Sequence, residues 1–442
     1  MKKLMRNAAV LAAGGLFSKA LGALYRIPLT NILGAEGIGV YQMVFPFYTV
    51  LLTLSSTGIP SGLSRLTADG KVDALKRSIA FFGSLGLLGS VVMFFGAQAI
   101  SSLQGNIAAA GAYRALSPSV AAVSLISCFR GYFQGKFKTF PTALSQVVEQ
   151  LVKLAFGLFV CYNFGSTAAE KAAFAALAVT VSELFALLLL VFFRREKTVG
   201  ATAPSVKALC RAVFPITLSS IMLPLSKTAD GFISLNLMGG GAKATAMLGL
   251  YGGVVESVVS LPVSLCYALA VSGIPFIAKG GEKNGAKVIK YTLFLSVILA
   301  ALTFVFSELI INILYPKLTP NETITAVNLL KISSLSVIGL SLTQAFSATF
   351  IGKGRLFVSP ICLGAGVIAK IASTFLLVSG ARLNVYGCAF SDIICYLVAS
   401  FSFLLYIIKE YSIKKKVDSP KDEKENEAFG YRAWRQKRRR FS

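Results

Sequence analysis

A series of long apolar segments is the feature that most constrains this chain. A helix needs about 20 apolar residues to cross the hydrocarbon layer of a membrane. Only 14% of the residues are charged, against about 25% in a soluble domain, so a soluble enzyme is excluded. The short alternating segments of a membrane β-barrel are also absent from the sequence. We therefore predict an all-α polytopic membrane protein with twelve spans, at roughly 7–33, 38–62, 78–103, 115–135, 142–163, 171–193, 210–235, 246–272, 288–314, 325–350, 358–379 and 384–408.

The basic residues predict the orientation of these spans. The formal net charge is +25, and cytoplasmic loops of membrane proteins carry an excess of Lys and Arg. With the N-terminus in the cytoplasm, most basic residues fall in cytoplasmic segments. The predicted outer loops hold only Arg114, Lys171, Lys243, Lys317 and Arg382. We expect both termini in the cytoplasm, and we interpret the basic, apolar start as the first span and not as a cleaved signal peptide.

The C-terminal segment 409–442 differs from the rest of the chain. It combines a Lys run, an acidic patch and the sequence YRAWRQKRRRF. We expect a disordered cytoplasmic tail that lies against anionic lipids, because polybasic segments next to a membrane are attracted to them. Nucleic-acid binding is the less favoured interpretation of this run.

Short motifs recur between spans that lie six apart. The repeated motifs are Thr57-Gly58-Ile59-Pro60 with Ser272-Gly273-Ile274-Pro275, Gly135-Lys136 with Gly352-Lys353, Lys153 with Lys370, and Ser18-Lys19 with Ser226-Lys227. The recurrence predicts two six-helix halves, 1–200 and 201–408, related by a pseudo-two-fold axis along the membrane normal, with a central cavity between them. Rocking of the halves would give alternating access, with hinges at Gly58, Pro60, Gly273 and Pro275.

Several charged residues lie at membrane depth, where a charge is costly unless it faces a cavity or a partner. Cations in a central cavity suit an anionic cargo, because Arg and Lys bind phosphate oxygens. The candidate substrate-binding residues are Lys19, Arg26, Lys153, Lys227 and Lys370. A non-transporting scaffold is the alternative, but it would leave these charges unexplained.

The acidic residues in the spans have two open roles, namely binding a coupling Na⁺ or H⁺ and balancing the charge of the cations. The candidates are Asp230, Glu256 and Glu149. Local pairing is an alternative, since Glu149 precedes Lys153 by four residues and Lys227 precedes Asp230 by three. Glu183 and Asp392 are interpreted as interhelical partners.

No catalytic or metal-binding motif is present in the sequence. The chain has no histidine, no phosphate-binding loop and no CxxC pair. We expect no enzyme activity, no metal and no cofactor. Transport would be driven by a coupling Na⁺ or H⁺ or by the membrane potential, in a transport unit that is monomeric.

The sequence resembles the polysaccharide-exporter branch of the multidrug/oligosaccharidyl-lipid/polysaccharide exporter superfamily. The resemblance covers about 1–408. For the branch it rests on Ser18-Lys19-Ala20-Leu21-Gly22, Tyr25-Arg26-Ile27-Pro28 and Leu33-Gly34-Ala35-Glu36-Gly37-Ile38-Gly39-Val40-Tyr41-Gln42. For the stage V sporulation protein B group it rests on Thr57-Gly58-Ile59-Pro60-Ser61-Gly62-Leu63-Ser64-Arg65, Phe129-Arg130-Gly131-Tyr132-Phe133-Gln134-Gly135, and Pro224-Leu225 leading to Asp230.

This resemblance implies the flipping of undecaprenyl-pyrophosphate-linked sugars across a bacterial plasma membrane, with the peptidoglycan precursor lipid II as one candidate cargo. In related lipid II flippases, cavity arginines on spans 1, 2 and 8 bind the pyrophosphate. Arg26 lies close to the first of these positions, whereas the predicted spans 2 and 8 hold no arginine. Those flippases also have two further spans that form a groove for the lipid tail. The alternative within the superfamily is an ion-coupled multidrug antiporter that exports cations.

Overall fold

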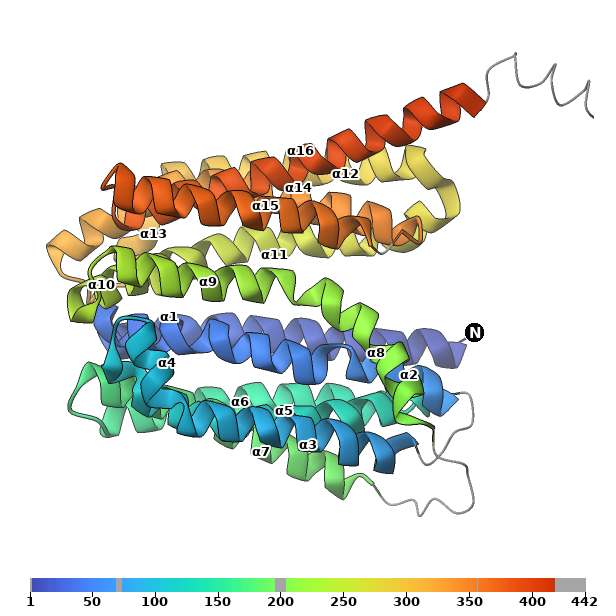
Figure 1. Cartoon of the computed structure of the whole chain (residues 1–442), viewed down its shortest axis with the longest axis horizontal. Coiled ribbons are helices and arrows are strands. Elements are labelled where there is room, and N and C mark those ends of the chain that lie inside the picture. Colours follow the sequence, from blue (N-terminus) through green and yellow to red (C-terminus); the bar gives the residue numbers. More distant parts are fainter. Residues whose placement is uncertain (1, 69–73, 195–203, 356, 418–442) are drawn as a thin grey trace, which may run out of the picture.

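The protein is a bundle of long helices in a computed structural model that describes residues 2–68, 74–194, 204–355 and 357–417. No strand occurs in these ranges. The long helices run along the longest axis of the molecule (Figure 1). The α-helices are α1 (Lys2–Leu52), α2 (Ile59–Ala68), α3 (Ala74–Phe95), α4 (Ala97–Leu103), α5 (Ala110–Gly135), α6 (Phe140–Asn163), α7 (Ala168–Phe192), α8 (Val206–Ser220), α9 (Met222–Leu237), α10 (Gly241–Leu248), α11 (Glu256–Ser272), α12 (Ile274–Val305), α13 (Ser307–Leu314), α14 (Pro320–Gly352), α15 (Val358–Thr374) and α16 (Val385–Val417).

Four short helices of other types connect or extend these elements. The 3₁₀-helix η2 (Ile107–Ala109) precedes α5, and the π-helices are η1 (Thr53–Thr57), η3 (Gly249–Val255) and η4 (Phe375–Gly380). In a membrane, a helix satisfies its own backbone hydrogen bonds, so long apolar sequences fold in this way. The prediction of an all-α polytopic membrane protein is confirmed.

The described residues contain ten helical stretches that are long and apolar enough to cross a membrane. Two features separate this number from the predicted twelve. The stretch Leu24–Thr67 includes a kink at Gly34, where φ is 68° and ψ is −179°, and such a backbone favours glycine. The predicted span 210–235 is divided between α8 and α9, which have 15 and 16 residues. The count of twelve therefore stays a prediction.

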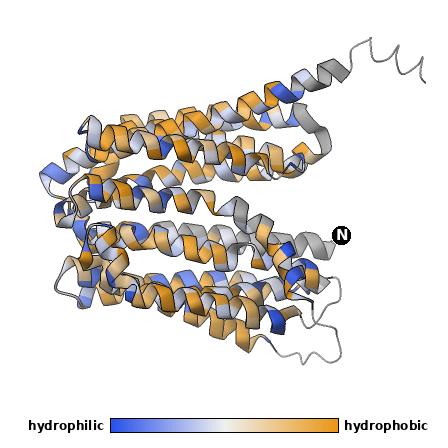
Figure 2. Ribbon diagram, viewed as in Figure 1, coloured by the Kyte–Doolittle hydropathy of each residue, from blue (hydrophilic) through white to orange (hydrophobic). Residues whose placement is uncertain are grey.

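Hydrophobic residues make up most of the length of the helices, and hydrophilic residues gather toward the helix ends (Figure 2). Many large apolar side chains point outward, among them Phe95, Leu188 and Leu376. A soluble protein rarely exposes contiguous apolar surface on this scale. A hydrocarbon layer accounts for it, because apolar side chains that face lipid tails carry no hydration cost.

The motifs that recur in the sequence also make similar contacts. Gly58 and Gly273 both have helical dihedral angles, with φ of −79° and −74°, and each precedes a new helix. The following helices, α2 and α12, receive Gly135 of α5 and Gly352 of α14 respectively. A Cβ on Gly135 would lie 2.5 Å from the Ser64 carbonyl oxygen, and one on Gly352 would lie 2.9 Å from the Ile277 Cβ. This repeated packing is compatible with the predicted duplication, and the two halves stay a prediction.

The helix α1, which belongs to the first half of the chain, 1–200, packs against the second half, 201–408. A Cβ on Gly39 would lie 2.0 Å from the Thr245 carbonyl oxygen, and one on Gly249 would lie 2.0 Å from the Ala35 carbonyl oxygen. The Gln42 side chain also donates a hydrogen bond to the Gly252 carbonyl. These contacts involve α10 and η3, and α10 lies at the end of the bundle away from the N-terminus (Figure 1). Glycines at such a crossing let two helix backbones approach closely.

Three of the sequence predictions fall on residues or side chains that the structure does not fully describe. Of the predicted tail, the structure describes 409–417 as the end of α16, and 418–442 lie outside the described ranges. The backbone of Lys19 and Pro275 is helical, but their side chains are not among those described.

Candidate functional site

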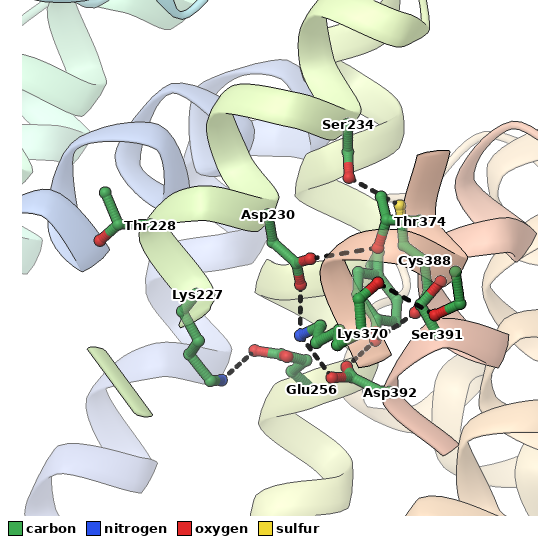
Figure 3. Close-up of polar contacts among 12 residues, drawn as sticks. Lys227, Thr228, Asp230, Ser234, Glu256, Lys370, Thr374, Cys388, Ser391 and Asp392 are labelled. Carbon is green, nitrogen blue, oxygen red and sulfur yellow. Dashed lines mark hydrogen bonds and ion pairs between the residues drawn. The ribbon is translucent and has the colours of Figure 1, made fainter. Parts of the chain in front are cut away.

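A buried lysine lies between two carboxylates in the second half of the chain. The Lys370 ammonium of α15 forms ion pairs with Asp230 of α9 and with Asp392 of α16, the second at 2.5 Å to Oδ1 (Figure 3). Only 3% of the Lys370 side chain is exposed. The helix α9 thus meets the distant helices α15 and α16 around one ammonium group.

Further donors surround the two carboxylates. The Tyr251 hydroxyl of η3 donates a hydrogen bond to Asp392, and the Thr374 hydroxyl donates one to Asp230 at 3.5 Å. A buried ion pair is tolerated when hydrogen bonds satisfy the remaining lone pairs. Lys370 and Asp230, both predicted as site residues, are brought together here, and a coupling cation at Asp230 would compete with the resident ammonium.

A second ion pair lies beside this cluster. Lys227 of α9 donates to Glu256, the first residue of α11, at 2.7 Å. The Lys227 side chain is 49% exposed, so this pair is far more accessible than the Lys370 cluster. The alternative in which Lys227 pairs with Asp230 on the same helix is wrong, because each binds a residue of another helix.

In the first half of the chain, Glu149 of α6 pairs with Arg130 of α5. The Arg130 Nη2 lies 2.9 Å from Glu149 Oε2, and its Nε donates to the Ser145 hydroxyl at 3.0 Å. The alternative pairing of Glu149 with Lys153 is therefore wrong, because the interhelical guanidinium takes the carboxylate. The Lys153 ammonium instead lies over the Tyr25 ring, 5.8 Å from its centroid.

Arg26 of α1 contacts the second half of the chain. Its Nη1 donates to the Ser257 hydroxyl of α11 at 3.4 Å. Arg26, Ser257 and Tyr315 line a small cavity of about 20 Å³. The buried Tyr315 hydroxyl has no hydrogen-bond partner among the described residues, and burial raises the pKa of Tyr315 to about 12, so this hydroxyl remains a neutral donor.

The four predicted site cations whose side chains are described differ in their partners. Lys370 and Lys227 both hold carboxylates, whereas neither Arg26 nor Lys153 has an acidic group within 4 Å in the described part of the chain. Lys153 lies within electrostatic range of Glu149, Glu183 and Arg26, but neither carboxylate is within 4 Å of its ammonium group. Two neighbouring cations without a carboxylate in direct contact make this region attractive to an anion.

A larger, almost wholly apolar pocket of about 490 Å³ lies between the end of α1, α3, α5 and α8. Its lining includes Leu54, Leu88, Val92 and Phe214, which are exposed to the surroundings of the bundle. The pocket therefore opens toward the surface that would face lipid. Sequence reasoning did not identify it, because its walls come from four separate helices.

Sequence reasoning also missed Tyr251 and Ser257. Tyr251 donates to Asp392, and Ser257 accepts from Arg26. A tyrosine or serine inside an apolar segment carries no signal of its partner in the sequence. Only the packing of distant helices reveals these two contacts.

Several proteins of Bacillus subtilis (strain 168) have sequences similar to this chain. The uncharacterized membrane protein YabM is 28% identical over 396 residues, covering 84% of this chain and 74% of the relative. Stage V sporulation protein B is 26% identical, covering 70% of this chain and 66% of the relative. Lipid II flippase MurJ is 25% identical, covering 65% of this chain and 60% of the relative.

Solved structures share the fold. An inward-facing multidrug resistance MATE family transporter of the MOP superfamily superimposes with a TM-score of 0.77, at 16% identity, covering 91% of this chain and 96% of the other. Lipid II flippase MurJ in an inward closed conformation gives a TM-score of 0.75, at 13% identity, covering 90% and 87%.

The sequence profile of one family covers more than half of the chain. The profile described as polysaccharide biosynthesis protein matches residues 4–281. Together with the shared fold, this match confirms the resemblance to the polysaccharide-exporter branch. The chain belongs to the polysaccharide biosynthesis protein family.

Proposed function

We propose that this protein is a flippase that moves an undecaprenyl-pyrophosphate-linked sugar across the bacterial plasma membrane. The observation that carries the proposal is the pair of cations Arg26 and Lys153, neither of which has an acidic partner within 4 Å in the described ranges. Charges at membrane depth without a partner are costly and are retained at functional sites. A diphosphate supplies the two negative charges that these cations lack.

Arg26 is the proposed primary contact with the diphosphate. A guanidinium binds two phosphate oxygens at once, and the unpartnered Tyr315 hydroxyl offers one more donor nearby. The cavity of about 20 Å³ beside Arg26 is too small for a diphosphate. Cargo would enter when α1 and α11 separate, and we propose rocking of the halves 1–200 and 201–408 about Gly58, Pro60, Gly273 and Pro275 as that movement.

The apolar pocket supports a cargo with a lipid tail. Its volume of about 490 Å³ and its exposed apolar lining suit a segment of a prenyl chain. Apolar pockets bind apolar chains through close packing. The tail would pass along α3 while the charged head group crosses between the halves.

The alternative function, ion-coupled export of cations, requires accessible carboxylates. Asp230, Glu256 and Glu149 are held by Lys370, Lys227 and Arg130 respectively. This pairing favours the charge-balancing role that we propose for the three acids. The alternative retains the support of the fold shared with the multidrug transporter.

Flipping of a fluorescent polyprenyl-pyrophosphate-linked sugar in liposomes tests the proposal. The protein is reconstituted as the wild type, Arg26→Gln, Lys153→Gln and the exposed control Arg114→Gln. A hydrogen bond to a charged group contributes about 1.5–3 kcal/mol, so each of the first two changes is expected to slow flipping about tenfold or more. The control should keep the wild-type rate. Unchanged flipping in both Arg26→Gln and Lys153→Gln would refute the proposed site.

A drug-sensitivity assay separates the two functions. Expression of a cation exporter should protect cells against cationic drugs, and Asp230→Asn or Glu256→Gln should remove this protection. We expect no protection by the wild type. Protection that depends on either carboxylate would instead support the antiporter.

A further inference from the structure

Glu183 of α7 has a different environment from the carboxylates of the ion pairs. It lies in the packing of the first half of the chain, where only 3% of the residue is exposed. The Tyr48 hydroxyl of α1 donates a hydrogen bond to its Oε1 at 2.5 Å. Its other oxygen, Oε2, is buried and has no hydrogen-bond partner among the described residues.

No basic group lies within 4 Å of Glu183 in the described ranges, whereas the buried Asp230 and Asp392 both hold Lys370. An isolated ionised carboxylate in an apolar interior costs many kcal/mol, and such a group becomes neutral instead. A carboxylic acid with one accepted hydrogen bond is a far less costly group at this position.

The neighbours of Glu183 come from three helices. Tyr41 and Tyr48 face it from α1, Lys153 and Glu149 face it from α6, and the Ser119 hydroxyl faces it from α5. Ser119 donates to the Leu116 carbonyl at 2.7 Å, so it does not satisfy Oε2. Lys153 and Glu149 carry opposite charges, and Glu149 is itself paired with Arg130.

We propose that Glu183 is a proton-binding site of the first half of the chain, and that it is occupied in this conformation. The carboxylate takes up one proton from water and becomes a carboxylic acid, and no other bond is formed or broken. Sequence reasoning named Asp230, Glu256 and Glu149 as candidates either for proton or sodium coupling or for charge balancing. The geometry points instead to the carboxyl group that has no cation partner.

This site is connected to the helix that moves in the proposed cycle. Tyr48 belongs to α1, which also carries Gly39 and Gln42, the residues that contact the second half of the chain. Loss of the proton would place a charge beside Tyr48 and draw Lys153 toward it. The next step rests on the proposed function. A diphosphate bound by Arg26 and Lys153 would strengthen proton binding at Glu183, because its negative charge compensates the nearby positive charge.

Infrared spectroscopy of the full chain in liposomes tests the proton site without any cargo. A protonated carboxyl group has a carbonyl stretch that is separate from the bands of ionised carboxylates. We expect a positive carbonyl band in the difference between wild type and Glu183→Gln at neutral pH. The matched control Glu149→Gln should give no such band, since the Glu149 carboxylate forms an ion pair with Arg130. Superimposable carbonyl regions for wild type and Glu183→Gln would overturn the proposal.

A second variant keeps the test decisive if Glu183→Gln fails to fold. Tyr48→Phe retains the carboxyl group but removes its hydrogen-bond donor, so the same band should move to higher frequency. An unmoved band would contradict the assignment to Glu183. If the wild type shows the carbonyl band but does not flip the lipid-linked sugar, the proposed function is refuted and the proton site remains supported.

Flipping provides the functional readout. One titrating group changes a rate by at most about tenfold per pH unit. We expect a pH-dependent rate in the wild type and a rate that changes less than about twofold over the same range in Glu183→Gln. If the flipping rates of the wild type and Glu183→Gln depend on pH in the same way, protonation of Glu183 is not coupled to transport, and its proposed connection to the cycle is overturned.

Discussion

Replacement of Lys370 by methionine is expected to destabilise the second half of the chain strongly. Methionine approximates the shape of the lysine side chain but has no charge. In the wild type, the ammonium contacts Asp230 and Asp392, and the side chain is only 3% exposed. The variant therefore leaves two carboxylates in the protein interior without a cation.

The loss of stability expected for Lys370→Met is large because the ion pairs of Lys370 are buried. Removal of one partner of a buried ion pair costs about 3–5 kcal/mol, because an uncompensated charge remains. Lys227 offers a matched comparison, since it binds Glu256 at 2.7 Å but is 49% exposed. An exposed pair contributes about 0.2–1 kcal/mol, so Lys227→Met should be nearly neutral.

Thermal unfolding in detergent, followed with a thiol-reactive dye, measures the difference. Six cysteines are buried in the folded protein, including Cys388 and Cys395 on α16 beside Asp392. We expect a clearly lower midpoint for Lys370→Met and a midpoint close to that of the wild type for Lys227→Met. Addition of Asp392→Asn to Lys370→Met should recover part of the loss, because it removes one unpaired charge.

Two results would refute this reasoning. Equal midpoints for Lys370→Met and the wild type would mean that the ammonium does not compensate buried charge. A further loss of stability in Lys370→Met/Asp392→Asn would mean that the hydrogen bond from Tyr251 to Asp392 matters more than the charge.

Two further predictions concern the apolar pocket and the contact between the halves. Leu88→Trp should fill part of the pocket of about 490 Å³ and slow flipping several-fold, whereas Leu87→Trp, at an exposed position outside the lining, should leave the rate unchanged in the liposome assay. Equal rates would exclude the pocket as the path of the lipid tail. Gly249→Ala would place a Cβ 2.0 Å from the Ala35 carbonyl oxygen, and contacts under 3.0 Å are essentially never seen. It should therefore widen the spacing of spin labels at positions 36 and 243, in a cysteine-free background, by about 1 Å or more. Gly364→Ala, which meets no atom within 4 Å, is the control, and an unchanged spacing in Gly249→Ala would contradict the close contact.

The sequence predicted the fold class because a bilayer imposes a simple requirement on it. Long apolar segments can satisfy their backbone groups only as helices. The recurrence of Gly58 and Gly273, and of Gly135 and Gly352, was also visible in the sequence, and each pair has similar backbone or packing geometry in the structure. In this protein, the recurring glycine motifs of the sequence thus correspond to recurring backbone and packing geometry.

The number of spans depends on features that the apolar segments of the sequence do not show. The kink at Gly34 lies within a continuous helical assignment, and the predicted span 210–235 is shared by two shorter helices. Apolar character alone does not reveal where a helix bends or breaks. These features depend on backbone angles at a few residues and on the helices that pack beside them.

The sequence by itself determined that this chain crosses a membrane, that charged residues lie within its spans, and which residues those are. Only the tertiary structure decided which charges compensate one another. Spacing along one helix suggested that Glu149 pairs with Lys153 and Lys227 with Asp230, yet Glu149, Lys227 and Asp230 each pair with a residue of another helix. Coulomb attraction depends on distance in space, and helix packing fixes that distance. For the same reason, only the structure showed that Arg26, Lys153 and Glu183 lack a partner of opposite charge within 4 Å among the described residues.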